Sequence, residues 1–145
     1  MNNDYEKNVF INCPFDDEYL SLLRPILFTI IYLGFIPRIS LESFDSGKPR
    51  FNKICELIEQ SKYSIHDLSR IKARKKGEYF RLNMPFELGL DIGCRIFQKE
   101  KYSDKKHLIL EKEKYRYQAA ISDLSNSDIK SHKNDPMIND SCSAN

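Results

Sequence analysis

Carboxylate, amide, imidazole and guanidinium side chains recur directly after the apolar runs of this chain, and they are the groups with which it could do chemistry. Aspartate and glutamate in such positions predict an acidic ligand site, and arginine is suited to bidentate contact with phosphate. The candidates fall into four groups along the chain. They are Asn12, Phe15, Asp16 and Asp17; Glu42, Asp45 and Ser46; His66, Asp67, Ser69 and Arg70; and Arg81, Asn83 and Glu87.

Familiar catalytic motifs are absent from the sequence. It contains no G-x-G-x-x-G, G-x-x-x-x-G-K-[ST], H-E-x-x-H or G-x-S-x-G, which argues against phosphate-loop ATPases, zinc proteases and α/β-hydrolases. The four cysteines and three histidines are too widely spaced for a zinc or redox motif. We therefore expect no bound metal, and we expect Cys13, Cys55 and Cys94 to be reduced and to act as small buried apolar residues.

Short β-favouring runs alternate with segments of helical periodicity, which predicts βαβ units and a mostly parallel sheet. We expect one three-layer α/β domain of flavodoxin-like type with four or five strands. It would cover residues 8–132, between a tail at 1–7 and a polar, disordered tail at 133–145. The expected strands are residues 9–13, 35–41, 62–68 and 107–110, with an edge strand at 128–130, and the expected helices are 19–33, 51–61, 87–97 and 115–124.

Individual residues predict local features of these helices. Pro25 should kink the first helix or mark a second start. Asn83 fits an N-cap, and Glu87 in a first helical turn would be held ionised by the helix dipole. Gly89 and Gly93 lie four residues apart and would let their helix approach the sheet closely.

The four groups of candidate residues should meet at one edge of the sheet, because ligands of open parallel sheets bind beyond the carboxyl ends of the strands. This convergence is the main argument from the residues for a binding site. Each group also has a purely structural interpretation. Asp16 and Asp17 can serve the dipole of the first helix, His66 and Asp67 can form a strand-end turn, and Asn83 can be a cap.

The size and charge of the chain limit the classes of protein. Its 145 residues suit one domain, and 23 basic against 21 acidic residues do not favour a nucleic-acid binder. The basic run from Arg70 to Arg81 is either a solvated loop or a rim that attracts an anion. An apolar run of about 20 residues and a signal peptide are both missing, so we expect no membrane span and a cytoplasmic location.

The order of motifs resembles that of TIR-type domains. The run from Val9 to Glu18 resembles their first strand and acidic loop, and residues 58–65 are similar to their helix-to-strand segment. The segment NMPFELG at residues 83–89 resembles both the TIR segment with its helical glutamate and the F-E-x-G segment of nucleoside 2-deoxyribosyltransferases. Residues 9–132 as a whole look like a group of bacterial proteins with the blocks FINCPFD, IHDLSR and NMPFELG.

The chain departs from both family patterns. It has no tryptophan, so Phe80 or Phe86 is the ring nearest to the role of the TIR aromatic residue. Asn83 stands where the deoxyribosyltransferase pattern has an aspartate. After residue 135 the chain lacks the amphipathic helix that would close a TIR domain.

The resemblance implies cleavage of an N-glycosidic bond in NAD⁺ or a related nucleotide, which is the substrate, with no further cofactor. Glu87 would stabilise or attack the ribosyl cation, and Asp67 would hold ribose hydroxyls or orient Glu87. A homo-oligomer in bacterial antiphage defence is implied as well. The alternatives are a deoxyribosyltransferase-like enzyme and a non-catalytic nucleotide-binding or self-assembly module. Substrate contacts are expected from Asn12, Phe15, Asp16, Arg70, Arg81 and Asn83.

Overall fold

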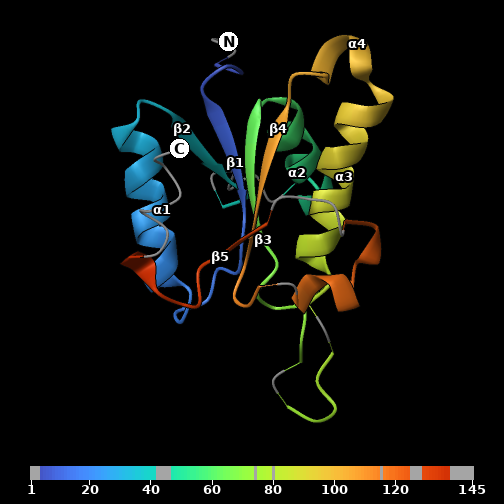
Figure 1. Cartoon of the computed structure of the whole chain (residues 1–145). Helices are drawn as coiled ribbons and strands as arrows, with labels where there is room; N and C mark the ends of the chain where they lie inside the picture. The colour runs from blue at the N-terminus through green and yellow to red at the C-terminus, as the bar shows by residue number, and fades with distance from the viewer. Residues whose placement is uncertain are drawn as a thin grey trace.

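The computed structural model describes residues 4–41, 47–73, 75–79, 81–114, 116–124 and 129–137. Strands and helices alternate along most of this length (Figure 1). The strands are β1 Asn8–Asn12, β2 Ile36–Ile39, β3 Tyr63–Asp67, β4 Lys106–Glu111 and β5 Ile129–Ser131. The helices are α1 Leu20–Tyr32, α2 Arg50–Glu59, α3 Asn83–Phe97 and α4 Lys99–Tyr102, followed by the short 3₁₀ helices η1 Arg116–Ala119 and η2 Ser122–Leu124.

The five strands form one sheet in the order β2-β1-β3-β4-β5, and every neighbouring pair is parallel. Parallel neighbours require crossover connections, which α1, α2 and α3 supply between the first four strands. The order is the flavodoxin-like one, with a switch point between β1 and β3. The predicted α/β class and parallel sheet are therefore confirmed.

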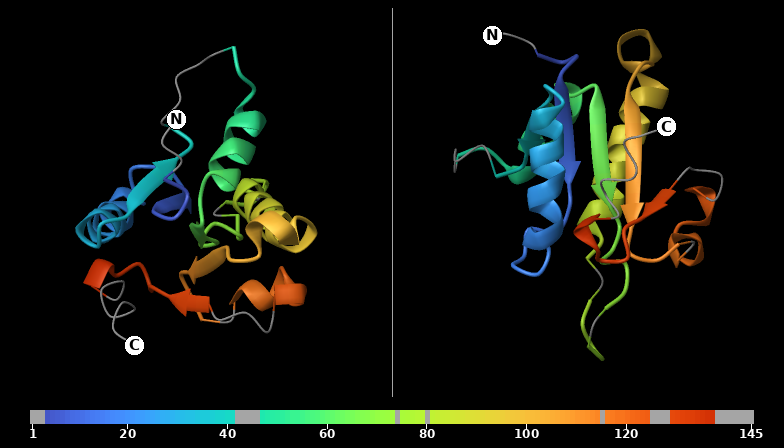
Figure 2. Two further views of the ribbon diagram at one scale, coloured as in Figure 1. Left: turned by 90° about the horizontal axis from the view of Figure 1, so that it is seen from above. Right: turned by 60° about the vertical axis from the view of Figure 1, so that its left-hand side comes forward.

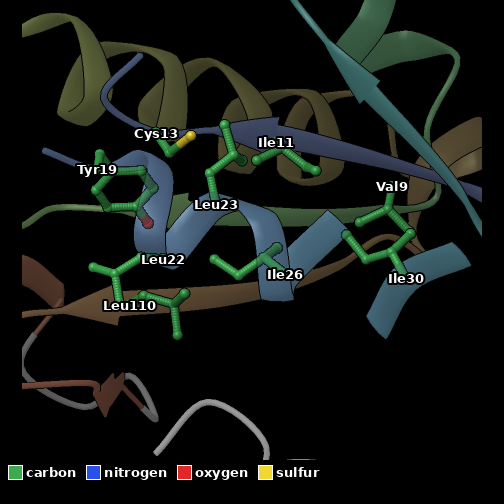
Figure 3. Packing of buried hydrophobic residues seen from close by; sticks show 9 residues of the cluster. All are labelled: Val9, Ile11, Cys13, Tyr19, Leu22, Leu23, Ile26, Ile30 and Leu110. Atoms are coloured by element: carbon green, nitrogen blue, oxygen red, sulfur yellow. The ribbon is translucent and has the colours of Figure 1, made fainter. Parts of the chain in front are cut away.

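Helix α1 covers one face of the sheet and helices α2 and α3 cover the other (Figure 2). The alternation of side chains along β1 explains these layers, because Val9 and Ile11 pack under α1 whereas Phe10 packs against α2. Figure 3 shows the core of the α1 face. Its buried members are Val9, Ile11, Cys13, Tyr19, Leu22, Leu23, Ile26, Ile30 and Leu110.

Two expectations about helices are decided by the structure. Helix α1 continues through Pro25, which excludes a second start there and leaves the other alternative, a kink. The helix expected at residues 115–124 is replaced by η1 and η2, although Tyr115 itself lies outside the described residues. Tertiary anchors explain the change, since Tyr117 is buried in the core and Arg116 is bound to Glu111 and to the Ser69 carbonyl. The edge strand is present as β5, but Asp128 lies outside the described part.

Helix α3 also differs from expectation. Asn83 is its first residue, Leu82 takes the N-cap position, and no described side chain caps the helix start. Gly89 and Gly93 do not face the sheet. They line an apolar groove of about 520 Å³ between α2 and α3, hereafter the α2–α3 groove, and a Cβ at Gly89 would meet nothing within 4 Å among the described atoms. Met84 and Leu88 make the contact with the core instead.

Residues flanking the expected domain take part in the fold. The Tyr5 carbonyl accepts a hydrogen bond from the Lys62 amide, and the Tyr5 hydroxyl donates to Asp104 at 3.0 Å. At the other end, the Lys133 amide donates to the Lys112 carbonyl. In the part of the chain that the structure describes, no helix has the length and apolar character needed to cross a membrane.

A buried group of charges joins α3 to the sheet. Asp91 has no exposed surface, and its Oδ2 lies 3.0 Å from His66 Nε2 and 3.1 Å from His107 Nδ1. Its Oδ1 lies 3.1 Å from the ammonium of Lys105, which is itself 1% exposed. We call these four residues the Asp91 cluster.

The Asp91 cluster is internally compensated. Burial alone would raise the pKa of Asp91, but hydrogen bonds from His107 and His66 and the charge of Lys105 hold it well below its ordinary value. Burial lowers the pKa of His66 in spite of Asp91, so that ring is neutral. Lys105 also donates to the carbonyls of Ile58 and Ser61, which satisfies the remaining ammonium protons.

We predict that Asp91→Asn strongly destabilises the fold, because it leaves the Lys105 ammonium buried without its counter-ion. Breaking a buried pair in this way costs about 3–5 kcal/mol. Chemical denaturation measures the loss, with the exposed Asp123→Asn as the matched control. A loss below about 1 kcal/mol for Asp91→Asn would show that the cluster does not hold α3 to the sheet.

Candidate functional site

The carboxyl edge of the sheet gathers the ends of β1 and β3 and the start of α3, as the sequence predicts (Figure 1). Asn12 ends β1 and is 3% exposed. Its Nδ2 donates to the Met84 carbonyl at 2.8 Å and lies 2.9 Å from His66 Nδ1. The amide nitrogen of Asn12 is therefore used to tie β1, β3 and α3 together.

Asp67 ends β3 and has no exposed surface. Its Oδ2 accepts the Tyr19 hydroxyl at 2.5 Å and lies 3.0 Å from His132 Nε2, while its Oδ1 accepts the Ser69 amide at 2.7 Å. Because the Asn134 amide donates to His132 Nδ1 at 3.0 Å, the proton of a neutral His132 ring is on Nε2, facing Asp67. Asp67 thus holds the start of α1, the β3–α3 loop and the segment after β5, and both of its oxygens are already bonded within the fold.

Asp16 lies within a group of ions. Arg70 donates to both of its carboxylate oxygens at 3.0 and 3.1 Å, and Arg81 lies 3.5 Å from Oδ2. The Tyr19 amide donates to Asp16 Oδ1 at 3.0 Å, close to the start of α1. Phe15 is half-buried and packs against the core of the α1 face.

A polar cavity of about 350 Å³ lies next to the Asp16–Arg70 pair. Its cationic lining consists of Arg70, Lys72, Lys112 and Arg116, which come from segments that follow β3 and β4. Arg70 Nε is buried and has no hydrogen-bond partner within the described ranges. The cavity therefore has cationic groups suited to an anion, of which Arg70 is also paired with Asp16 and Arg116 with Glu111.

Glu87 differs from expectation in place and in charge. It is the fifth residue of α3, beyond the first turn, and it is 7% exposed. Burial raises its pKa from 4.5 to about 7, and among the described residues Arg50 supplies the positive charge that opposes this rise. The helix dipole therefore does not keep Glu87 fully ionised at neutral pH.

The charges of three predicted carboxylates act on one buried thiol. Cys13 is 4% exposed, and burial, followed by the charges of Asp67, Asp16 and Glu87, raises its pKa. The predicted residues are thus brought to a common region. Asn83 and Arg81 are exposed at its rim.

Sequence reasoning missed residues that the site depends on. Tyr19 and His132 hold Asp67, Arg50 faces Glu87, and Asp91 anchors α3. Asp91 carried a signal, because it follows Glu87 by four residues and so shares the helix face that Leu88 places in the core. Of the predicted residues, Glu42, Asp45, Ser46 and Phe80 lie outside the described part of the chain.

The ligand atoms of His66, Asp91 and His107 lie within 4.8 Å of one another, which is compatible with a metal ion. The chemistry of the surroundings does not fit one. The Lys105 ammonium already provides the positive charge at Asp91 Oδ1, and a divalent cation would have to face it.

The chain is similar in structure to the TIR domains of the activated Roq1 resistosome directly recognising the pathogen effector XopQ. The TM-score is 0.55 at 13% sequence identity, and the match covers 83% of this chain and 72% of that chain. The fold is TIR-like. No family model and no curated protein matches the sequence.

The raised pKa of Glu87 predicts that stability falls as pH rises from about 4.5 to 7, because the folded state binds the proton more tightly than the unfolded one. The shift corresponds to about 3 kcal/mol, at 1.36 kcal/mol per pKa unit. Glu87→Gln should remove this pH dependence. The free energy of unfolding of the variant, relative to that of the parent protein, should therefore be about 3 kcal/mol higher at pH near 8 than at pH near 4.5.

Urea denaturation at the two pH values measures this difference, and the exposed Glu100→Gln is the matched control. Equal pH dependence in the parent protein and in Glu87→Gln would mean that Glu87 titrates normally.

Proposed function

We propose that this chain is a TIR-like hydrolase or cyclase that cleaves the N-glycosidic bond of NAD⁺ or a related nucleotide. The observation that carries the proposal is Glu87, a nearly buried carboxyl group with a pKa of about 7 at the carboxyl edge of a TIR-like sheet. Strongly perturbed carboxyl groups concentrate at catalytic sites, because a pKa near the working pH gives access to both protonation states.

The reaction follows from the charge that develops in the ribose. The base leaves with the electron pair of the glycosidic bond, and positive charge spreads over C1′ and the ring oxygen. The Glu87 carboxylate stabilises that cation, or attacks C1′ to form an ester. In the hydrolase case, a water molecule then attacks C1′, releases the Glu87 carboxylate where an ester had formed, and loses its proton. In the cyclase case, a nucleophile within the substrate attacks C1′ instead. Because Glu87 is largely desolvated, its interaction with the cation is stronger than in water.

The phosphate groups have a natural place in the polar cavity beside Asp16. Arg70, Lys72, Lys112 and Arg116 supply positive charge there. Arg81 is exposed and close enough to Asp16 to turn toward the same anion. In this proposal Asn12 and Asp67 position the loops of the site, and Phe15 and Asn83 remain candidates for contact with the base and ribose.

We predict that the purified protein releases the base from NAD⁺ and that Glu87→Gln lowers kcat by about 10²–10³, as loss of a preorganised electrostatic group does. If the carboxylate is the active form, kcat/KM rises with pH through about 7 in the parent protein. Chromatography of the released base, with NAD⁺, NADP⁺ and deoxynucleosides supplied in parallel, makes the measurement.

Glu100→Gln is again the matched control and should keep full activity. Release of base from deoxynucleosides alone would favour the deoxyribosyltransferase-like alternative. An equally active Glu87→Gln protein would remove Glu87 from the mechanism and leave a nucleotide-binding module as the better hypothesis.

The proposal includes self-association, and the cytoplasm and bacterial antiphage defence as its setting. The TIR domains that share the fold belong to an activated resistosome. In this chain, α1 and the residue after it expose an apolar stripe. Its members are Phe28 at 69%, Ile31 at 61%, Tyr32 at 78% and Leu33 at 56% exposure, and the rings of Phe28 and Tyr32 stack at 6.0 Å. Contiguous apolar surface of this kind is typical of an interaction site.

We expect Phe28→Ser with Tyr32→Ser to weaken self-association by about tenfold or more, since aromatic residues dominate interface energetics. Sedimentation velocity over a concentration series gives the constant. Tyr79→Ser, which removes a ring that is 93% exposed elsewhere, is the control. A monomer at every concentration of the parent protein would contradict this part of the proposal.

A further inference from the structure

The α2–α3 groove is an apolar hollow on the face of the sheet opposite to α1 (Figure 2). Ile58 and Leu90 line it, and the rings of Phe86 and Phe97 stand at its border with 56% and 87% exposure. Large apolar side chains that remain exposed around a hollow are typical of a surface where another molecule docks. Glu87 does not line the groove, so this surface is separate from the chemistry of that residue.

The α3 side of the groove has room for a second helix. Gly89 and Gly93 follow one another at a spacing of four residues, and Phe97 continues the same row to the end of α3. A Cβ at Gly89 would meet nothing within 4 Å among the described atoms, and one at Gly93 would meet the Phe97 ring at an ordinary contact distance. Rows without side chains allow close approach of another backbone. The row covers eight residue steps, which is about 12 Å of helix.

The apolar stripe of Phe28, Ile31, Tyr32 and Leu33, hereafter the α1 stripe, belongs to a helix of matching length. Phe28, Ile31 and Tyr32 are related as i, i+3 and i+4, which is the spacing of the anchors that an amphipathic helix places in a groove. The exposed Arg24 lies one turn before Phe28 on the same side of α1. From Arg24 to Tyr32 this side covers eight residue steps, as the row on α3 does.

The charges of the two surfaces are complementary as well. Among the described residues that line the groove, Glu59 alone is charged, and Arg24 is the one charged residue of α1. Glu59 ends α2, whose last turn carries no basic residue, so both its carboxylate and the helix dipole favour a cation there. Lys101 of α4 also acts on Glu59, but it lies outside the lining of the groove. With Arg24 at Glu59, a docked α1 runs antiparallel to α2.

We propose that the α2–α3 groove binds the α1 stripe of a second copy of this chain. The inference rests on the self-association in the proposed function and names the surface that the stripe meets. A single copy cannot join its own two surfaces, because α1 and the groove lie on opposite faces of the sheet (Figure 2). The contact is therefore head-to-tail, and such contacts build rings or open filaments rather than closed dimers.

Two variants that each lack one surface test this pairing. The stripe variant combines Phe28→Ser with Tyr32→Ser. The groove variant combines Gly89→Gln with Gly93→Gln, which fills the groove at two helical positions that have room for a Cβ. Each variant alone should self-associate about tenfold or more weakly than the parent protein. Mixed in equal amounts, they should form a heterodimer that does not grow, because one keeps the groove and the other keeps the stripe.

Sedimentation velocity with one variant labelled by a fluorophore measures the heterodimer. Arg95→Gln, which changes an exposed residue of α3 outside the groove, is the control and should self-associate like the parent protein. A groove variant that self-associates as strongly as the parent would overturn the proposal, since the stripe would then pair elsewhere. A parent protein that stays monomeric at every concentration would instead contradict the proposed self-association itself, and this inference with it.

Exchange of the two charges gives a second measurement that a misfolded variant cannot imitate. Arg24→Glu and Glu59→Arg each place like charges together and should each weaken self-association by about fivefold or more. Both residues are exposed, so the fold is kept. The chain that carries both changes should recover the association of the parent protein. Failure of this recovery, while the parent protein self-associates, would overturn the placement of α1 in the groove and leave the proposed self-association standing.

Discussion

The burial of the Asp91 charge is the constraint on which the rest of this structure depends. A carboxylate without exposed surface has to be met by partners of opposite charge or by donors, and here these come from β3, from β4 and from Lys105 just before β4. Meeting them fixes the rotation of α3 about its axis. One flank of the helix then presents Gly89 and Gly93 to the α2–α3 groove, and the other lines a cavity of about 650 Å³ beside His107.

The position of α3 places the carboxyl groups of Glu87 and Asp91, which are one helical turn apart, in opposite environments. Asp91 has three partners and a depressed pKa, whereas Glu87 is buried opposite Arg50 alone among the described charges and has a pKa of about 7. Pairs of titratable groups whose pKa values are pushed apart are a mark of acid–base and electrostatic catalysis. Because Asp91 joins α3 to the sheet, the same helix holds Glu87 one turn away in a place that disfavours its charge.

The elements of the fold were predictable because their signals are local. Apolar runs gave the strands and helical periodicity gave α1 to α3, so the parallel sheet followed from the order of segments. The partners of the polar residues were not predictable in the same way. Tyr19 lies 48 positions from Asp67 in the sequence, and Ser69 lies 63 positions from His132. No local sequence pattern predicts either of these contacts. The helix expected after β4 is absent for the same reason. Tyr117 is buried in the core and Arg116 donates to the Ser69 carbonyl, and these contacts are with residues distant in the sequence.

The carboxyl ends of parallel strands therefore predict where polar side chains gather. They do not predict which of these side chains are already hydrogen-bonded within the fold. Asn12 and Asp67 look like ligand contacts in the sequence, and the structure shows the Asn12 amide nitrogen and both Asp67 oxygens bonded within the fold. A ligand gains little from a group that is already satisfied, because the internal bond must first be broken. Among the described residues, the groups left without full compensation include Glu87 and the buried atoms Ser61 Oγ, Arg70 Nε and His107 Nε2. Such groups cost folding free energy, and for the acidic edge of the sheet Glu87 is the one whose charge a cationic ligand could stabilise.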